Sequence, residues 1–409
     1  MKFFLNLLFF LIIMGGTARS QSLIKTVQCY PLGRPFDEPV IELGTNQQLF
    51  FCFDDLGSEN NSYTYKILHC DPDWNNSNLN PFNYLSGFFN NPLDNYQYSF
   101  NTIVPYTHYT LTFPNEQTGI KISGNYLLQV FNDMNPDSAV ISQRFAVVES
   151  RVNITASVVN SSNPKSLYTS QQLNFSVNYS NLSIYNPIRD VRVYVTQNQD
   201  PNTRLDFKPT FVRPAQLVYG DGQNNIFNGL SPFRNFQCSS TVYYTQYVKD
   251  VLKGPEGRYN FILQPGTVPQ RYIPLPDRYG NYYIEAENVQ NSNLEADYII
   301  AHFAIMYEQP IPGADVYVYG KFSDWRLLPA HKMSYDSKNK AYVGQAELKQ
   351  GYYDYMYAVV PVANPRPDLV TLQNNFYQTP NEYNIRFYVY DYNQMCFRLY
   401  GYKRMIADL

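Results

Sequence analysis

Apolar and polar residues alternate with a period of two along much of this chain. The clearest run is YTYKILHC, residues 63–70, in which Tyr63, Tyr65, Ile67 and His69 share one face of an extended strand. Residues 96–100, 191–195 and 301–307 alternate in the same way, and no stretch sustains the 3.6-residue period of a helix. The pattern therefore predicts an all-β protein.

The predicted strands are short, and polar turns separate them about every 8–12 residues, which is typical of immunoglobulin-like β-sandwiches. A length of 409 residues corresponds to two to four domains at roughly 100–200 residues per domain. The polar stretch at residues 288–293 is the clearest internal boundary. We predict tandem sandwiches: an N-terminal β-sandwich over 22–150, a central β domain over 151–295 and a C-terminal β-sandwich over 296–409.

Residues 1–20 have the pattern of a cleaved signal peptide. A short basic start precedes the apolar run FFLNLLFFLIIM, and Ala18-Arg19-Ser20 forms a small-x-small cleavage site. The apolar run is too short to span a bilayer, and cleavage would leave Gln21 and not a lipid-bearing cysteine. We therefore expect an exported chain with no direct membrane insertion.

The composition is rich in aromatic residues and poor in charge. The chain has 39 Tyr and 27 Phe, and only 16% of its residues are charged. Aromatic residues favour pleated sheet and also suit surfaces that pack against proteins. A net charge of −3 gives no basis for binding nucleic acid.

Residues 53–74, FDDLGSENNSYTYKILHCDPDW, gather the side chains that most resemble a metal or nucleophile site. His69 and Cys70 are adjacent on a predicted strand, so they point to opposite faces and cannot chelate one ion. Asp54 and Asp55 diverge for the same reason, whereas a glycosidase pair must converge on one bond. With no metal, phosphate or nucleophile motif elsewhere, we predict no catalytic residues, no metal and no cofactor.

The cysteines number five, which is odd for an exported chain. At most two disulfides can form, and at least one thiol stays free. Pairing among Cys29, Cys52 and Cys70 remains open, because spacing alone does not show whether the Cα atoms come close enough.

Several motifs, weak alone but specific together, cover nearly the whole chain after residue 20. In this order they resemble the plug proteins of the type IX secretion system of Bacteroidetes-type bacteria. The motifs are PLGRPFDEPVIELG (31–44), FDDL (53–56), YTYKILHCDPDW (63–74), SFNT (99–102), PYTHYTLTFPNE (105–116), SGNYLL (123–128), LDFKPTF (205–211), FNGLSPFRNF (227–236) and LQNNFYQTPNEYNI (372–385).

The resemblance implies a function that composition does not reveal. Members of that family are all-β periplasmic proteins that associate with the outer-membrane β-barrel translocon and close its periplasmic mouth when no substrate is passing. It implies a non-enzymatic accessory protein, monomeric within the complex and held at the outer membrane by its protein partner.

The segment 75–95 that follows Trp74 is long for a connector, and such loops are usually functional or packed by their own side chains. Its aromatic residues fit either interpretation. As the candidate partner-facing surface we predict Phe82, Tyr84, Phe88 and Phe89.

A second, local resemblance covers residues 316–360, VYVYGKFSDW…MSYD…GYYDYMYAVV. This segment is similar to the early-set sandwich that precedes the catalytic barrel in glycogen-branching enzymes, and to glycogen-binding modules. In the binding members a tryptophan at the place of Trp325 stacks on sugar. The alternative function is therefore an exported glycan-binding protein that uses Trp325, and the competing interpretation makes Trp325 a structural core residue.

Overall fold

The computed structural model describes residues 23–57, 61–220, 224–407 and 409. Strands dominate it, which confirms the predicted all-β class. The predicted signal peptide lies outside the described residues. The helical elements are single turns: α1 (Pro81–Tyr84), α2 (Pro187–Asp190), α3 (Ser292–Glu295), η1 (Lys321–Ser323) and η2 (Pro329–His331). Within the described residues, no helix is long and apolar enough to cross a membrane.

The first sandwich consists of two sheets with a core between them that is rich in Phe and Tyr. One sheet has the order β1 (Ile24–Pro31), β3 (Leu49–Asp55), β8 (Thr107–Phe113), β7 (Tyr96–Tyr98). The other has the order β2 (Val40–Glu42), β11 (Asn135–Val148), β10 (Gly124–Asn132), β4 (Tyr63–Cys70), β6 (Asn91–Pro92). A small ribbon of β5 (Leu85–Gly87) and β9 (Thr118–Ile120) lies at its side.

The second sandwich is built from two separate parts of the chain. One sheet contains β12 (Asn153–Asn160), β13 (Ser170–Asn178), β17 (Gln216–Tyr219) and β16 (Phe211–Arg213), with β18 (Ile226–Asn228) also paired to β13. The other has the order β15 (Asp200–Phe207), β14 (Val191–Gln197), β28 (Glu382–Asp391), β29 (Cys396–Ile406).

The third sandwich is one sheet folded around a single core. Its order is β19 (Arg234–Gln237), β27 (Gly351–Pro361), β24 (Ala314–Tyr319), β25 (Lys332–Asp336), β26 (Ala341–Lys349), β23 (Tyr298–Met306), β21 (Tyr259–Leu263), β20 (Val248–Lys253), with β22 (Tyr282–Ile284) also on β27. Strand β25 pairs with both β24 and β26 and so turns the corner between the two layers.

The sheets divide the chain differently from the predicted boundary between residues 295 and 296. Strands β28 and β29, predicted in the C-terminal unit, extend a sheet of the second sandwich through β14. Strands β19 to β22, predicted in the central unit, belong to the sheet of the third. Alternation along a strand specifies its faces but not its hydrogen-bonding partner, which explains the difference.

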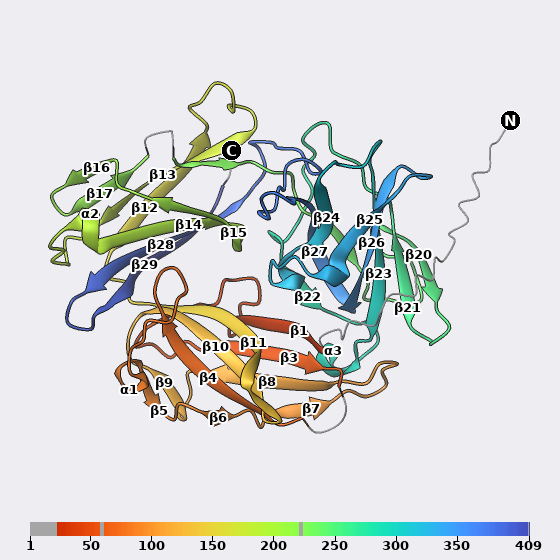
Figure 1. Cartoon of the computed structure of the whole chain (residues 1–409), viewed down its shortest axis with the longest axis horizontal. Helices are drawn as coiled ribbons and strands as arrows, with labels where there is room; N and C mark the ends of the chain where they lie inside the picture. The colour runs from red at the N-terminus through yellow and green to blue at the C-terminus, as the bar shows by residue number, and fades with distance from the viewer. Residues whose placement is uncertain (1–22, 58–60, 221–223, 408) are drawn as a thin grey trace.

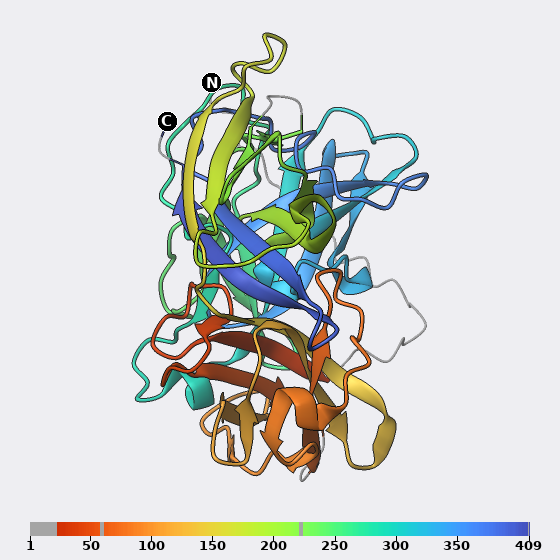
Figure 2. The ribbon, with the colours of Figure 1, turned by 90° about the vertical axis from the view of Figure 1, so that its left-hand side faces the viewer.

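The second and third sandwiches lie side by side above the first (Figure 1). After a quarter turn the first sandwich still lies beneath the other two (Figure 2). Small apolar clusters join them: Tyr194, Tyr388 and Leu399 of the second sandwich pack with Val40 and Ala146 of the first. The three sandwiches therefore meet around a common junction.

Candidate interaction surface and the junction behind it

Strand β4 has the alternation predicted for residues 63–70. Tyr63, Tyr65, Ile67 and His69 are buried on one face, and the His69 ring packs against Tyr126 with centroids 5.1 Å apart. Burial lowers the pKa of His69 to about 4. A side chain at Gly124 would place its Cβ 2.4 Å from His69 Nε2, and the φ of +152° there also favours glycine. His69 is thus a neutral core residue that needs a glycine beside it.

The side chains of Asp54 and Asp55 on β3 point in opposite directions, as predicted. Asp54 also contacts the third sandwich, which the sequence did not indicate. Asp55 accepts hydrogen bonds from Tyr63 Oη at 2.8 Å and Asn61 Nδ2 at 2.7 Å, within the first sandwich. Asp54 points the other way, toward the third sandwich. Among the described residues, no group of three or more His, Cys, Asp or Glu side chains is placed to hold a metal ion.

Asp54 is the centre of a buried polar cluster between the first and third sandwiches. Its Oδ2 accepts from Lys349 Nζ at 2.6 Å and from Tyr298 Oη at 2.7 Å, and its Oδ1 lies 2.6 Å from His108 Nδ1. Asp54 and Lys349 are 0% and 1% exposed. Burial lowers the pKa of Lys349, and the Asp54 charge opposes that shift. Because a buried charge that loses its partner is costly, this pair favours one relative placement of the two sandwiches.

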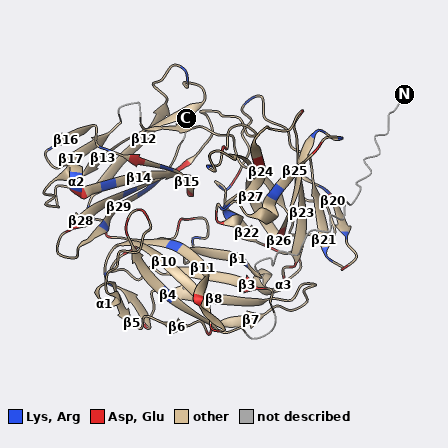
Figure 3. Cartoon of the chain, in the orientation of Figure 1, with Lys and Arg blue, Asp and Glu red and all other residues tan. Residues whose placement is uncertain are grey.

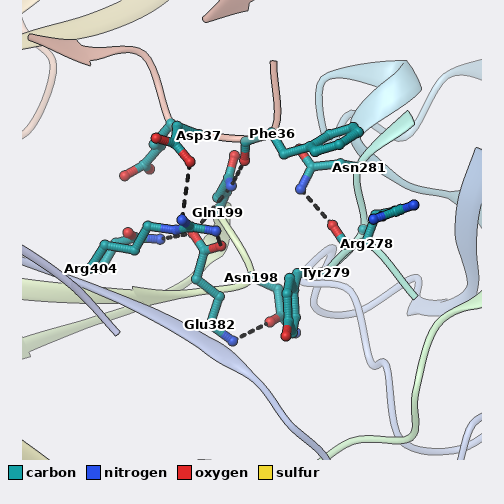
Figure 4. A network of polar contacts seen from close by, with 12 residues as sticks. Phe36, Asp37, Asn198, Gln199, Arg278, Tyr279, Asn281, Glu382 and Arg404 are labelled. Atoms are coloured by element: carbon teal, nitrogen blue, oxygen red, sulfur yellow. Dashed lines mark hydrogen bonds and ion pairs between the residues drawn. The ribbon is translucent and has the colours of Figure 1, made fainter. Parts of the chain in front are cut away.

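Arg404 links the second sandwich to the first at the junction (Figure 4). Its guanidinium donates to Asp37 Oδ1 at 3.0 Å and to Glu382 Oε2 at 2.8 Å. Nearby, Arg386 pairs with Glu38 at 2.8 Å and is 4% exposed. Both basic residues lie on β28 and β29, the strands that return to the second sandwich late in the chain.

Gln199 connects all three sandwiches at the same junction. Its Nε2 donates to the carbonyl oxygen of Phe36 at 2.8 Å, and its Oε1 accepts from Lys321 Nζ at 2.7 Å. Lys321 also donates to Asn281 Oδ1 at 2.5 Å. Phe36 belongs to the first sandwich, Gln199 to the second, and Lys321 and Asn281 to the third, so one hydrogen-bond chain spans the molecule.

The segments that cross between the second and third sandwiches are bound to each other. Asn381 Nδ2 donates to the carbonyl of Gly229 at 2.6 Å and to Gln171 Oε1 at 3.1 Å, while Leu230 N–H donates to Asn375 Oδ1 at 2.7 Å. Gly229 and Leu230 come from the motif at 227–236, Asn375 and Asn381 come from the motif at 372–385, and Gln171 lies on β13. Their place in the structure shows that these two motifs form the paired crossovers between sandwiches.

Trp325 is 5% exposed and belongs to a small core with Tyr319, Phe233 and Leu230. Its ring centroid lies 5.3 Å from that of Tyr319, and its carbonyl oxygen accepts from Asn202 Nδ2 at 3.1 Å. A sugar platform requires an open ring face, whereas the Trp325 side chain is almost fully covered. Trp325 therefore occupies the position of a structural core residue, the interpretation that competes with sugar binding.

The predicted partner-facing residues separate into two pairs. Phe82 and Phe88 are 78% and 71% exposed, whereas Tyr84 is buried and Phe89 packs against the core of the first sandwich. Asn80 caps α1, because its side chain accepts from Phe82 N–H at 3.1 Å. The cap sets a single turn in which Tyr84 points inward, with its hydroxyl 3.3 Å from the carbonyl of Ile67, and Phe82 points outward.

Two further exposed aromatic residues, which sequence reasoning did not single out, lie on edge strand β7. Tyr96 and Tyr98 are 46% and 52% exposed, and their rings meet edge to face at 5.7 Å. Strand β7 and the α1–β5 turn lie on the side of the first sandwich that faces away from the other two (Figure 1). We call Phe82, Phe88, Tyr96 and Tyr98 the outer rim.

All five cysteines are free and buried. Burial raises the pKa of each thiol, to about 11 for Cys70 and Cys396. Charged side chains are few, and both signs are mixed over the three sandwiches (Figure 3). Over the described residues, therefore, neither a reactive thiolate nor a large area of one charge sign marks a candidate surface.

The fold and the junction define a class: an all-β protein of three interlocked sandwiches whose conspicuous polar clusters hold the units together. A family model described as "Type 9 secretion system plug protein 1st domain" matches residues 24–149, the first sandwich. The first sandwich thus belongs to the first-domain family of type IX secretion system plug proteins, which supports a role associated with type IX secretion.

One solved structure is similar to nearly the whole chain. The crystal structure of a hypothetical protein from Parabacteroides merdae is 31% identical, covering 94% of this chain and 98% of that one, with a TM-score of 0.90. Alpha-2-macroglobulin structures from E. coli and Salmonella, 10% and 9% identical, cover 93% of this chain but 22% and 23% of their own, with TM-scores of 0.18, too low for any inference. No curated protein matches the chain.

Proposed function

We propose that this protein is a non-enzymatic accessory of type IX secretion that binds the outer-membrane translocon barrel and seals its periplasmic mouth when no substrate is passing. The observation that carries the proposal is the match of the whole first sandwich to the plug protein model. In this proposal the protein resides in the periplasm and is held at the outer membrane by the barrel. An unsealed pore of that kind would leak small solutes, so a resting secretion channel needs such a partner.

The junction supports a sealing role because a seal must keep its shape against the barrel. Between the first sandwich and the other two lie the buried pairs Asp54–Lys349 and Arg386–Glu38 and the hydrogen-bond chain through Gln199. Separating the sandwiches would leave buried charges unpaired, which costs several kcal/mol per ion. The molecule therefore suits docking as one body.

The outer rim is the proposed contact with the barrel. Large exposed aromatic side chains are the usual anchors of protein interfaces, and the rim presents them on the side that the other sandwiches leave uncovered.

Co-purification from outer-membrane extracts tests the binding. Wild-type protein should recover a large β-barrel protein, and the double variant Phe82→Ser with Phe88→Ser should recover it at least tenfold less, since each lost anchor weakens binding by roughly 1–2 kcal/mol. The matched control is Tyr185→Ser with Ile188→Ser, exposed apolar residues of the second sandwich at 90% and 69% exposure. Recovery of wild-type protein without a barrel would contradict the proposal. Equally reduced barrel recovery in both double variants would show that the outer rim is not the contact.

Permeability tests the sealing separately. Cells that lack the gene should take up bulky antibiotics faster than wild-type cells, because the translocon pore stays open. Restoring the wild-type gene should reverse the effect. Unchanged uptake in the deletion strain, with barrel binding intact in extracts, would leave a binding protein that is not a plug.

A further inference from the structure

Two adjoining cavities form a groove between the first sandwich and the other two. The larger, of about 860 Å³, lies between the first and third sandwiches, and the smaller, of about 360 Å³, lies where all three meet. Val27, Gln143, Tyr282 and Asp324 line both cavities, so the two are continuous. The larger volume is within the usual range for specific ligand sites.

Two strand edges run along the length of this groove. Strand β1 contributes residues 24–27 to the larger cavity and 27–30 to the smaller, and β11 contributes 140–143 and 143–146. Successive side chains of a strand point to opposite faces. A lining of consecutive residues therefore means that the backbone edge, and not one face of the sheet, borders the groove.

Along the groove, part of the β11 edge has no partner strand among the described residues. Strand β10 accompanies β11 on one side, while β2 pairs on the other side only at residues 146–148. Ala146 N–H donates to the carbonyl of Pro39 on the β2 side, so by the two-residue period the N–H groups of Arg144 and Ser142 point the same way. Among the described residues, no strand pairs with 140–145 of β11 on this side.

Aromatic side chains form the opposite wall of the groove, and one of them already bonds to the edge of β1. Tyr282, Tyr298, Tyr353 and Phe322 of the third sandwich line the larger cavity. Tyr282 Oη donates to the carbonyl of Val27 at 3.1 Å, which occupies the β1 edge. The β11 edge is thus the one left for a ligand, facing rings that suit apolar side chains.

The smaller cavity is lined by four basic side chains and three carboxylates, and one of these carboxylates, Asp324, interacts electrostatically with both Arg144 and Lys321. Arg144 lies over the Trp74 ring at 4.9 Å, and Lys321 is held by the amide oxygens of Gln199 and Asn281. Arg204 and Arg386, in contrast, pair with Asp73 and Glu38. An acidic group on a ligand would find its partners at Arg144 and Lys321.

We infer that this groove binds an extended segment of a protein partner, which adds as a strand to the edge of β11. The six unpaired residues, at roughly 3.3 Å each, accommodate a segment of about six or seven residues. Apolar side chains of the segment face the tyrosine wall, and an acidic residue lies at the Arg144 end. The site does not depend on whether the protein seals a pore, because it lies away from the outer rim.

Selection from a phage-displayed library of random heptapeptides on the immobilised full chain tests this inference. Enriched sequences should alternate apolar residues and carry Asp or Glu near one end. Synthetic copies should bind Ser142→Pro at least tenfold more weakly, because proline removes the outward N–H while sparing the ladder to β10. Arg144→Gln should weaken the acidic peptides about fivefold, and the exposed control Arg213→Gln should change nothing.

Backbone-methylated copies of the enriched peptides give a second measurement on the wild-type protein, in case Ser142→Pro does not fold. They should bind at least tenfold more weakly, since strand addition needs the ligand's own N–H groups. Failure to enrich any peptide would overturn the inference. Equal binding of methylated and unmethylated peptides, or displacement by maltohexaose instead of by unlabelled peptide, would overturn it as well.

Discussion

At the scale of single residues, burial between sheets changes the pKa of acidic side chains that the alternation pattern only places on strands. Asp354 of β27 is 0% exposed, and its Oδ2 accepts from the N–H groups of Arg278 at 2.6 Å and Gly280 at 3.1 Å. Burial, and then the nearby charge of Asp277, raises the pKa of Asp354 to about 7. Asp200 is affected in the same way, with a pKa raised to about 6.

These shifts predict a stability that falls with rising pH. The folded chain holds the Asp354 proton more tightly than the unfolded chain, so its contribution is complete below the ordinary value of 3.8 and is lost as pH rises through about 7. Asp354→Asn keeps an oxygen for the two N–H donors and removes the titration. The thermal midpoint of wild type should drop between pH 5 and pH 8, and that of the variant should drop less, with a remainder from Asp200.

The exposed Asp137→Asn serves as the control for this measurement and should keep the full pH dependence of wild type. If the Asp354→Asn variant lost stability with pH as steeply as wild type, Asp354 would not be the group responsible.

At the scale of elements, alternation predicted the strands well and their partners poorly. The period of two places Tyr63, Tyr65, Ile67 and His69 together because burial on one face is a local property. The pairing of β14 with β28 depends on contacts almost two hundred positions apart, for which one sequence carries no local signal. The loop after Trp74 shows the same limit: its aromatic content is visible, but only the α1 turn decides that Phe82 points out and Tyr84 in.

The paired crossovers make a prediction at this scale. Asn381 is 1% exposed, and its Nδ2 donates to the carbonyl of Gly229 on the other crossover and to Gln171 Oε1 of β13. Asn381→Ala leaves the Gly229 carbonyl without this donor, while Gln171 Oε1 keeps its bond from Tyr383 Oη, so the free energy of unfolding should fall by about 1–3 kcal/mol. Hydrogen exchange should rise first in residues 372–382 and 227–232. Asn393→Ala, in an exposed turn, is the control, and equal exchange in the two variants would argue against a structural role for the crossover contacts.

At the scale of the whole molecule, the interlocking of the sandwiches follows from the path of the chain. The chain leaves the second sandwich after β18, builds the third, and returns as β28 and β29. Because β29 also packs Leu399 against Val148 of the first sandwich, a strand from the end of the sequence touches two units at once. None of this was predictable from hydrophobic periodicity, and neither was the Asp54–Lys349 pair, whose members are 295 positions apart.

That pair gives the most direct test of whether the first sandwich is fixed to the third. Lys349→Met removes the cation and leaves the Asp54 carboxylate buried with only Tyr298 and His108 beside it, a change that typically costs about 3–5 kcal/mol. The variant should unfold at lower urea concentration, and protease should cut between the first sandwich and the rest. Adding Asp54→Asn removes the unpaired charge, so the double variant should recover much of the loss. If both single and double variants kept wild-type stability and protease resistance, the buried pair would not hold the sandwiches together, and the view of the protein as one rigid body would rest on the remaining junction contacts, such as those of Gln199, Arg404 and Arg386.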